Sequence, residues 1–296
     1  MPDTDVEAAP IKDEHQPVAA LRVLASGSGG NCSALILREG SQRRVCLIDL
    51  GLSPRRTKRE LKQAGLEMDE VEHVFITHFD SDHFNRSWGS YLGGQATFHV
   101  HTSHVSDARG LGVSSTVIDA VGQHTTVGDA NVYTTMLAHD DEGVAAFRFE
   151  HEGAVVGFAT DVGSPTGALI DHMSDADLLA IESNYCPQLQ ASSSRPAFLK
   201  ARIMGGRGHL SNQQCAAITR DAQPRQDVVL LHLSRQCNRP DLAKREHHGA
   251  PYRVTVSAQH ESTPWISVSP SNIESPRVQT VSRAAPVQSS MLFSRD

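Results

Sequence analysis

Residues 75–84 read Phe-Ile-Thr-His-Phe-Asp-Ser-Asp-His-Phe, and this stretch predicts the end of a buried strand that opens into a metal site. Four potential ligands follow the apolar run 74–76 within six residues: His78, Asp80, Asp82 and His83. In an extended segment, residues two apart point the same way, so His78 and Asp80 can contact one ion. Asp82 and His83 follow as the chain turns, and they can face a second ion. The alternative is a solvated acidic turn with two incidental histidines, but so many nitrogen and oxygen donors together favour a metal.

Other candidate ligands lie at or near the ends of apolar runs elsewhere in the chain, where strand ends bring side chains to a common edge. These residues are Asp49, His139, Asp161 and His232. A further histidine, His209, lies in the loop Gly208-His209-Leu210-Ser211 before a predicted helix. One histidine in such a place is more often structural than a ligand. Five such coincidences together with the 75–84 motif favour one shared site.

The order of apolar and polar segments predicts one folded domain over residues 18–258. Residues 1–17 are polar and acidic, which indicates a disordered tail, and residues 259–296 read as a disordered Ser/Pro-rich tail. Apolar runs predict strands or short buried segments at 21–26, 34–37, 45–50, 71–76, 96–101, 132–138, 144–149, 155–160, 178–181, 228–233 and 253–257. Helix signals lie at 53–65, 166–172, 196–203, 212–221 and 241–247. Strands come first and then alternate with helices in two halves, which favours an α+β protein with two packed sheets and helices outside.

Composition narrows the class of protein. The 296 residues are 39% hydrophobic, and we expect neither a signal peptide nor a membrane-spanning segment. Five cysteines, with no C-x-x-C pair, argue against a disulfide framework and for a cytoplasmic protein. The 16 histidines are many for this length, and the formal net charge of −7 neither supports nor excludes a polyanionic substrate. The sequence leaves the oligomeric state open.

The ligand pattern resembles that of the metallo-β-lactamase superfamily, which has an H-x-H-x-D-H motif after a strand, then a distant His, an Asp that bridges two metals, and a final His. This chain offers His78-x-Asp80-x-Asp82-His83, then His139, Asp161 and His232. The resemblance is closest to the YycJ/WalJ-like and PhnP-like hydrolase branch. The segments that carry it are Ser26-Gly27-Ser28-Gly29-Gly30-Asn31-Cys32, Ile48-Asp49-Leu50-Gly51-Leu52-Ser53, Thr160-Asp161-Val162-Gly163, Glu182-Ser183-Asn184, Gly208-His209-Leu210-Ser211-Asn212 and His232-Leu233-Ser234.

This resemblance implies a four-layer αββα sandwich and a role for each candidate residue. His78, Asp80 and His139 would hold one divalent metal, Asp82, His83 and His232 the second, and Asp161 would bridge them. The candidate catalytic residues are Asp82 and His209, and His209 would serve the phosphate or the leaving group. Further residues are expected to support the ligands or contact substrate, namely Asp49, Ser28, Asn31 and Asn184.

Two positions depart from the family pattern. Asp80 stands where the family has its second motif histidine, and Cys237-Asn238 stands where the YycJ-like group usually has a pair of asparagines. We expect two divalent cofactor ions, which could be Zn, Mn or Fe. The extra carboxylate favours the harder ions, Mn or Fe.

The predicted function is a dinuclear metal-dependent phosphodiesterase or nuclease that acts on DNA ends through a metal-bridging hydroxide. A cyclic small-molecule phosphodiesterase is the first alternative, and a non-catalytic scaffold is a weaker one. A di-iron redox protein is another, because flavodiiron members of the superfamily place a carboxylate where Asp80 lies. Such proteins normally carry a flavin-binding domain next, where we expect only the Ser/Pro-rich tail. The basic stretch 43–62 reads either as a solvated helix face or as a patch that binds nucleic-acid backbone.

Overall fold

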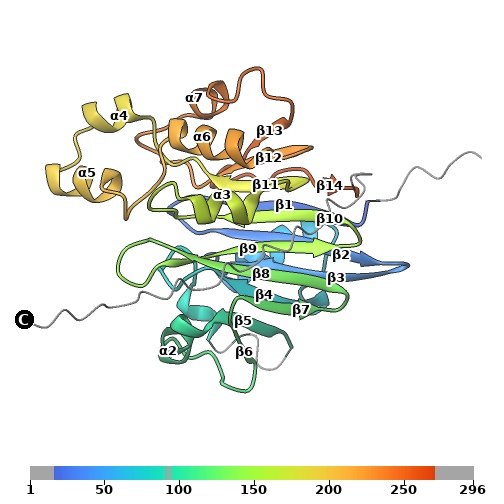
Figure 1. The fold of residues 1–296 in the computed structure, drawn as a ribbon. Coiled ribbons are helices and arrows are strands. Elements are labelled where there is room, and N and C mark those ends of the chain that lie inside the picture. The colour runs from blue at the N-terminus through green and yellow to red at the C-terminus, as the bar shows by residue number, and fades with distance from the viewer. Residues whose placement is uncertain (1–16, 90, 92–94, 271–296) are drawn as a thin grey trace, which may run out of the picture.

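The computed structural model describes residues 17–89, 91 and 95–270, and within them two seven-stranded sheets pack face to face (Figure 1). The first sheet has the strand order β14-β1-β2-β3-β4-β5-β6. Its strands are β1 Ala19–Ala25, β2 Cys32–Glu39, β3 Gln42–Ile48, β4 Val71–Ile76, β5 Thr97–His101, β6 Ile118–Val121 and β14 Ile266–Val268. Pairing is antiparallel from β14 to β3 and parallel from β3 to β6.

The second sheet repeats this plan, with the order β13-β12-β11-β10-β9-β8-β7. Its strands are β7 His124–Val127, β8 Ala130–Leu137, β9 Val144–His151, β10 Ala154–Ala159, β11 Leu178–Glu182, β12 Asp227–Leu231 and β13 Arg253–Val256. It is antiparallel from β7 to β10 and parallel from β10 to β13. The parallel half of each sheet therefore brings several carboxyl strand ends to one edge, which is where ligands bind in sheets of this kind.

Helices form the outer layers. They are α1 Pro54–Gln63, α2 Val105–Gly110, α3 Gly167–Met173, α4 Pro187–Ser192, α5 Ala197–Met204, α6 Asn212–Ala222 and α7 Pro240–Arg245, with short 3₁₀ turns at Met68–Glu70, Arg86–Trp88 and Thr102–His104. The predicted start of α1 is confirmed, since Ser53 caps the helix and Pro54 opens it. Whereas most helices lie on the sheets, α4 and α5 project beyond them at one end of the molecule (Figure 1). No helix in the described part of the chain is long and apolar enough to cross a membrane.

The largest core lies between the two sheets and fixes the strand that leads into the motif. Phe75 on β4 is fully buried and packs edge-on against Phe147 and Phe149 of β9, with ring centroids 5.4 and 5.0 Å apart. One further apolar cluster lies between the first sheet and its helices, and another lies between the second sheet and its helices. The predicted four-layer αββα sandwich is thus confirmed, and the motif begins directly beyond the best-packed part of the core.

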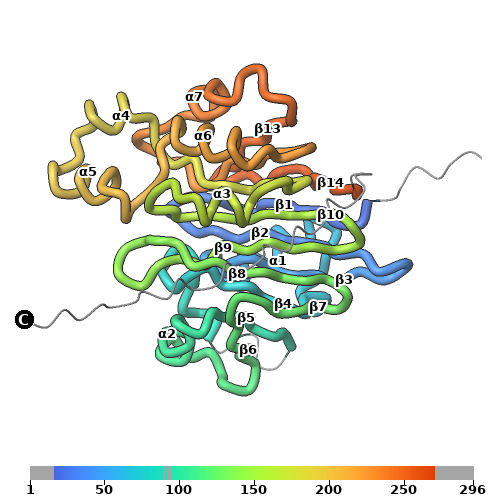
Figure 2. The backbone as a smooth tube through the Cα atoms, in the orientation of Figure 1, coloured from blue at the N-terminus to red at the C-terminus, as the bar shows by residue number. Residues whose placement is uncertain are grey.

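The predicted C-terminal domain boundary is wrong. Residues 259–270 were expected in the tail, yet β14 pairs antiparallel with β1, with Leu21 opposite Ile266 (Figure 2). Gln259 also donates to Gly30 O at 2.9 Å and accepts from Gly29 N at 2.6 Å. A three-residue strand in a Ser/Pro-rich segment has no periodicity of its own, and only the free edge of β1 defines it. The predicted tails at 1–16 and 271–296 lie outside the described residues.

Candidate metal centre and substrate pocket

The three residues predicted to share the first metal lie together. His78 and Asp80 follow β4, and His139 follows β8 on the other sheet. Asp80 Oδ2 lies 3.8 Å from His78 Nε2 and 4.0 Å from His139 Nε2. His78 Nε2 is buried and has no hydrogen-bond partner among the described residues, and a buried polar atom of this kind needs one. The three donors could therefore be satisfied by one cation between them.

The second predicted set also converges. Asp82 Oδ2 lies 3.9 Å from His83 Nε2 and 3.5 Å from His232 Nε2. His232 follows β12, and its imidazole is buried. Histidine nitrogens and a carboxylate oxygen are donors that Zn, Mn and Fe accept. This set fits a second cation.

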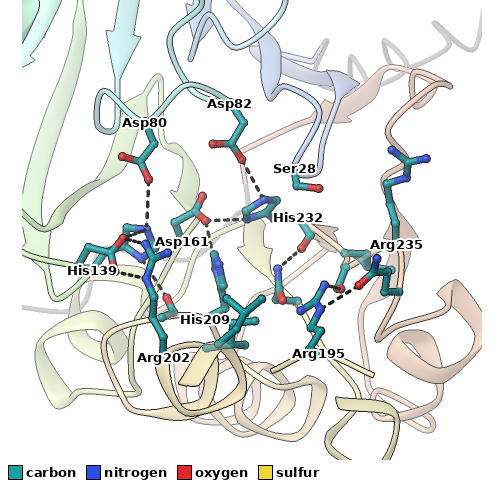
Figure 3. Close-up of a pocket in the computed structure, with 18 residues that line it drawn as sticks. Ser28, Asp80, Asp82, His139, Asp161, Arg195, Arg202, His209, His232 and Arg235 are labelled. Carbon is teal, nitrogen blue, oxygen red and sulfur yellow. Dashed lines mark hydrogen bonds and ion pairs between the residues drawn. The ribbon is translucent and has the colours of Figure 1, made fainter. Parts of the chain in front are cut away.

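Asp161 lies between the two sets (Figure 3). Its Oδ2 is 2.7 Å from His83 Nε2, and its Oδ1 is 2.7 Å from His232 Nδ1. It also forms a compact group with His78 and His83, in which the donor atoms lie within 4.8 Å of one another. Asp161 can thus reach donors of both sets, which is the position that a bridging carboxylate requires.

Asp49 supports His83 rather than facing the pocket. Its Oδ2 lies 2.7 Å from His83 Nδ1, and its Oδ1 accepts hydrogen bonds from the backbone and hydroxyl of Thr77, both at 2.9 Å. A carboxylate on Nδ1 fixes the imidazole tautomer and leaves Nε2 for a metal. Asn31 lies at the other ring nitrogen, the one that a metal would use: its amide nitrogen is 2.9 Å from His83 Nε2, and its Oδ1 accepts from Gly27 N at 2.8 Å.

Three of these residues hold an unusual backbone conformation. Asp49, Asp161 and His232 have φ angles of 62°, 51° and 53°, in the left-handed region that residues with a side chain rarely adopt. Asp49 and His232 directly follow β3 and β12, and Asp161 lies two residues after β10. Backbone strain of this kind persists where the surroundings hold it, and it gathers at functional sites.

The sequence analysis did not assign a role to Glu182, the last residue of β11. This fully buried carboxylate lies 2.7 Å from His209 Nδ1, and its other oxygen accepts from the backbone of Val162 and Leu210 at 2.9 and 3.0 Å. Glu182, Asp161, His209 and His232 form a further compact group of potential donors. A carboxylate at the end of an otherwise apolar strand next to β10 was the signal for it.

Because Glu182 holds His209 through Nδ1, the other ring nitrogen is the one available to a substrate. Burial opposes protonation of His209, but the negative charges of Glu182 and Asp161 outweigh it and raise the pKa of the imidazole to about 9. His209 is therefore protonated at neutral pH, as a general acid must be.

Protons and cations compete for this centre. Burial lowers the pKa values of His83 and His232, but the charges of Asp161 and of Asp49 or Asp82 beside them raise both pKa values well above the usual range. A metal that binds either imidazole therefore competes with a proton.

Metal affinity should consequently rise as the pH increases above the ordinary histidine range, with protons released on binding. Titration calorimetry with Mn or Zn, in buffers of different ionisation enthalpy, measures the number released. An affinity that does not change with pH, with no proton release, would contradict the protonation of His83 and His232.

The centre lies at the base of a cavity of about 710 Å³. Ser28 and Asn184, both predicted near the substrate, line it, whereas Asn31 does not. Three arginines that the sequence analysis did not single out also line it: Arg195, Arg202 and Arg235 (Figure 3). The cavity thus places carboxylates and histidines at its base and guanidinium groups on its wall.

Three of the seven basic residues in the stretch 43–62 pair with acidic neighbours. Arg43 pairs with Glu70, Arg44 bonds Glu39 at 2.9 Å, and Arg59 bonds the adjacent Glu60 at 2.7 Å. These pairs favour the solvated-surface interpretation of the stretch. None of its residues lines the cavity.

Comparison with known proteins agrees with this geometry. The model of the "Beta-lactamase superfamily domain" family matches residues 43–233. Exodeoxyribonuclease YycJ of Bacillus anthracis is 26% identical over 231 residues, which cover 75% of this chain and 85% of that protein. Exodeoxyribonuclease WalJ of Streptococcus pneumoniae is 29% identical over 233 residues, covering 75% and 84%. The crystal structure of a diphosphatase of the PhnP family has the same fold, with a TM-score of 0.59, 12% identity, and coverage of 85% of this chain and 98% of that one. The predicted resemblance to the YycJ/WalJ-like and PhnP-like branch is confirmed.

Proposed function

The chain belongs to the beta-lactamase superfamily and is a hydrolase of the metallo-β-lactamase fold, and from this premise we propose that it is a dinuclear metal-dependent phosphodiesterase that acts on DNA ends. The observation that carries the proposal is the pair of ligand sets, His78/Asp80/His139 and Asp82/His83/His232, with Asp161 2.7 Å from His83 and His232 of the second set and within 4.8 Å of His78 of the first. The exodeoxyribonuclease relatives support DNA as the substrate. The five cysteines are free and buried, which supports a cytoplasmic location.

The chain's own residues have distinct tasks in this mechanism. Two cations held by the ligand sets would supply Lewis acidity and a water of lowered pKa. Asp82 is an ionised carboxylate, because His232 and His83, despite burial of the group, hold its pKa at about 2. His209, held by Glu182 at 2.7 Å, would donate its proton to the leaving oxygen. Asp80 adds a hard oxygen donor, which is why we propose Mn or Fe before Zn.

The first experiment is hydrolysis of bis(p-nitrophenyl) phosphate by the purified protein, with metal analysis of the same sample and Mn or Zn added back. We expect metal-dependent turnover at about two ions per chain. A DNA strand labelled at one end and a cyclic phosphodiester then compete as substrates, and preferred cleavage of the DNA supports the proposal. Absence of turnover with any metal, or two bound irons with redox activity alone, would overturn it.

A further inference from the structure

The segment that carries α4 and α5 differs in charge from the rest of the chain. Residues 183–220 contain no aspartate or glutamate, but they contain Arg195, Lys200, Arg202, Arg207 and Arg220, in a protein of formal net charge −7. We call residues 187–207, which form α4, α5 and their connection, the cap. The cap lies over one side of the cavity, and its residues Arg195 and Arg202 reach the wall (Figure 3). Two of the three arginines that line the pocket thus belong to this short segment, and the third, Arg235, lies in the loop after His232.

Arg195 is a positioned cation without an acidic partner. It donates to Gln236 Oε1 at 3.0 Å, Ser234 Oγ at 3.1 Å and Gln190 Oε1 at 3.3 Å, and all three acceptors are neutral. No carboxylate in the described part of the chain pairs with it, whereas Arg202 on the same wall pairs with Asp140. Three neutral oxygens fix the guanidinium and leave its charge uncompensated, which suits it to bind an anion from outside the protein.

Arg235 extends this positive edge beyond Arg195. It lies in the loop after His232, between the two residues of that loop that hold Arg195, and it is exposed at the cavity wall (Figure 3). Arg195 and Arg235 come from different elements and border the same cavity. Their charges could contact successive phosphates of a chain that enters it.

Phe198 supplies an exposed aromatic ring on the cap, outside the lining of the cavity. Its exposed fraction is 75%, the highest of the large exposed hydrophobic residues in the described part of the chain. Other side chains of α5 fix the helix, since Leu199 and Ile203 pack with Tyr185. Phe198 and Arg202 are four residues apart on α5 and so are neighbours on one helix face. Phe198 is therefore available to a ligand that also meets the basic wall.

We propose that the cap binds a single DNA strand that leads into the metal centre, with Arg195 and Arg235 on backbone phosphates and Phe198 stacked on an unpaired base. Basic grooves combined with exposed aromatic rings bind single strands in this way. The inference rests on the proposed function and deepens it, because Phe198 lies outside the cavity lining and a small cyclic phosphodiester held in the cavity would not need it. The substrate is accordingly a polynucleotide end with at least one unpaired base.

Binding, measured separately from turnover, tests this inference. The probe is a fluorescent, phosphorothioate-linked single DNA strand of about twelve nucleotides, a length in the range of single-strand sites. Fluorescence anisotropy compares the wild-type protein with Phe198→Ala, Arg195→Gln and the control Arg55→Gln. Arg55 is an exposed cation of α1, in the competing basic stretch.

We expect Phe198→Ala to weaken binding about tenfold through lost stacking. Arg195→Gln should weaken it about fivefold and lower the salt dependence by about one counterion. Arg55→Gln should bind as the wild type does. A strand that lacks its bases but keeps its phosphates separates the two contacts, since Phe198→Ala should bind it no worse than the wild type. Equal melting temperatures show that the variants are folded.

Two outcomes would overturn the inference: unchanged affinity in Phe198→Ala and Arg195→Gln, or loss of affinity in Arg55→Gln alone. Hydrolysis of bis(p-nitrophenyl) phosphate by the wild type reports on the proposed function separately. Turnover without any effect of the cap variants on strand binding rejects the inference and keeps the proposed function. Strand binding through the cap without turnover keeps the inference and rejects the proposed function.

Discussion

Replacing Asp161 by asparagine should abolish phosphodiesterase activity, with a loss of at least about 10³-fold in kcat, because a two-metal site depends on the carboxylate that both ions share. Asp161 is the residue whose oxygens lie 2.7 Å from both His83 Nε2 and His232 Nδ1. Asparagine keeps the shape and tolerates the left-handed backbone at this position, so the fold should survive. The bound metal should fall from about two ions per chain to one or fewer.

The matched control is Asp175→Asn. Asp175 also has a left-handed backbone, with φ of 56°, but it is exposed and far in the sequence from every candidate ligand. This variant should keep both metals and full activity. Elemental analysis and turnover of the two variants, measured side by side, separate the carboxylate's role from backbone strain. An Asp161→Asn protein with two metals and wild-type kcat would refute a shared carboxylate.

The part of the fold that is local in sequence could be predicted. Runs such as 71–76 and 155–160 are apolar for the length of a strand and end at polar ligands, so both the strands and their ends were visible. Three of the four edge strands were not, whereas β13 matches the run predicted at 253–257. β6 and β7 are only four residues long, and β14 is three residues long within a Ser/Pro-rich segment, so each depends on its partner strand rather than on its own pattern.

The residues of the site could likewise be predicted only in part. Candidate ligands could be predicted because chemistry restricts metal donors to a few residue types, and the structure brings all seven together. Glu182 was not assigned a role, because a single carboxylate after an apolar run has no spacing signature until β10 and β11 are known to be neighbours. Arg195 was missed for a similar reason, since its lack of an acidic partner is a property of three-dimensional contacts alone.

Gly51 should be as important to the motif as the ligands themselves. It lies where three backbone segments meet, and a Cβ at this position would be 1.8 Å from Asp82 O and 2.6 Å from Asn31 N. Backbone hydrogen bonds beside Gly51 hold these segments together, since Leu50 N donates to His83 O at 2.8 Å and Asn31 N donates to Asp82 O at 2.7 Å. Both clashes are with backbone, so a rotamer change of a side chain cannot relieve them.

Gly51→Ala should therefore push the Asp82–His83 backbone outward, lower the free energy of unfolding by about 3 kcal/mol, and empty the second metal position. Gly167→Ala is the control, because a Cβ at the first residue of α3 meets nothing within 4 Å. That substitution should stabilise the protein slightly, since alanine favours a helix. Chemical denaturation and metal analysis of both variants test the difference. Gly51 lies where residues 27–31, 49–52 and 75–84 pack closely together. If Gly51→Ala kept two metals and wild-type stability, this close packing would not be what positions Asp82 and His83.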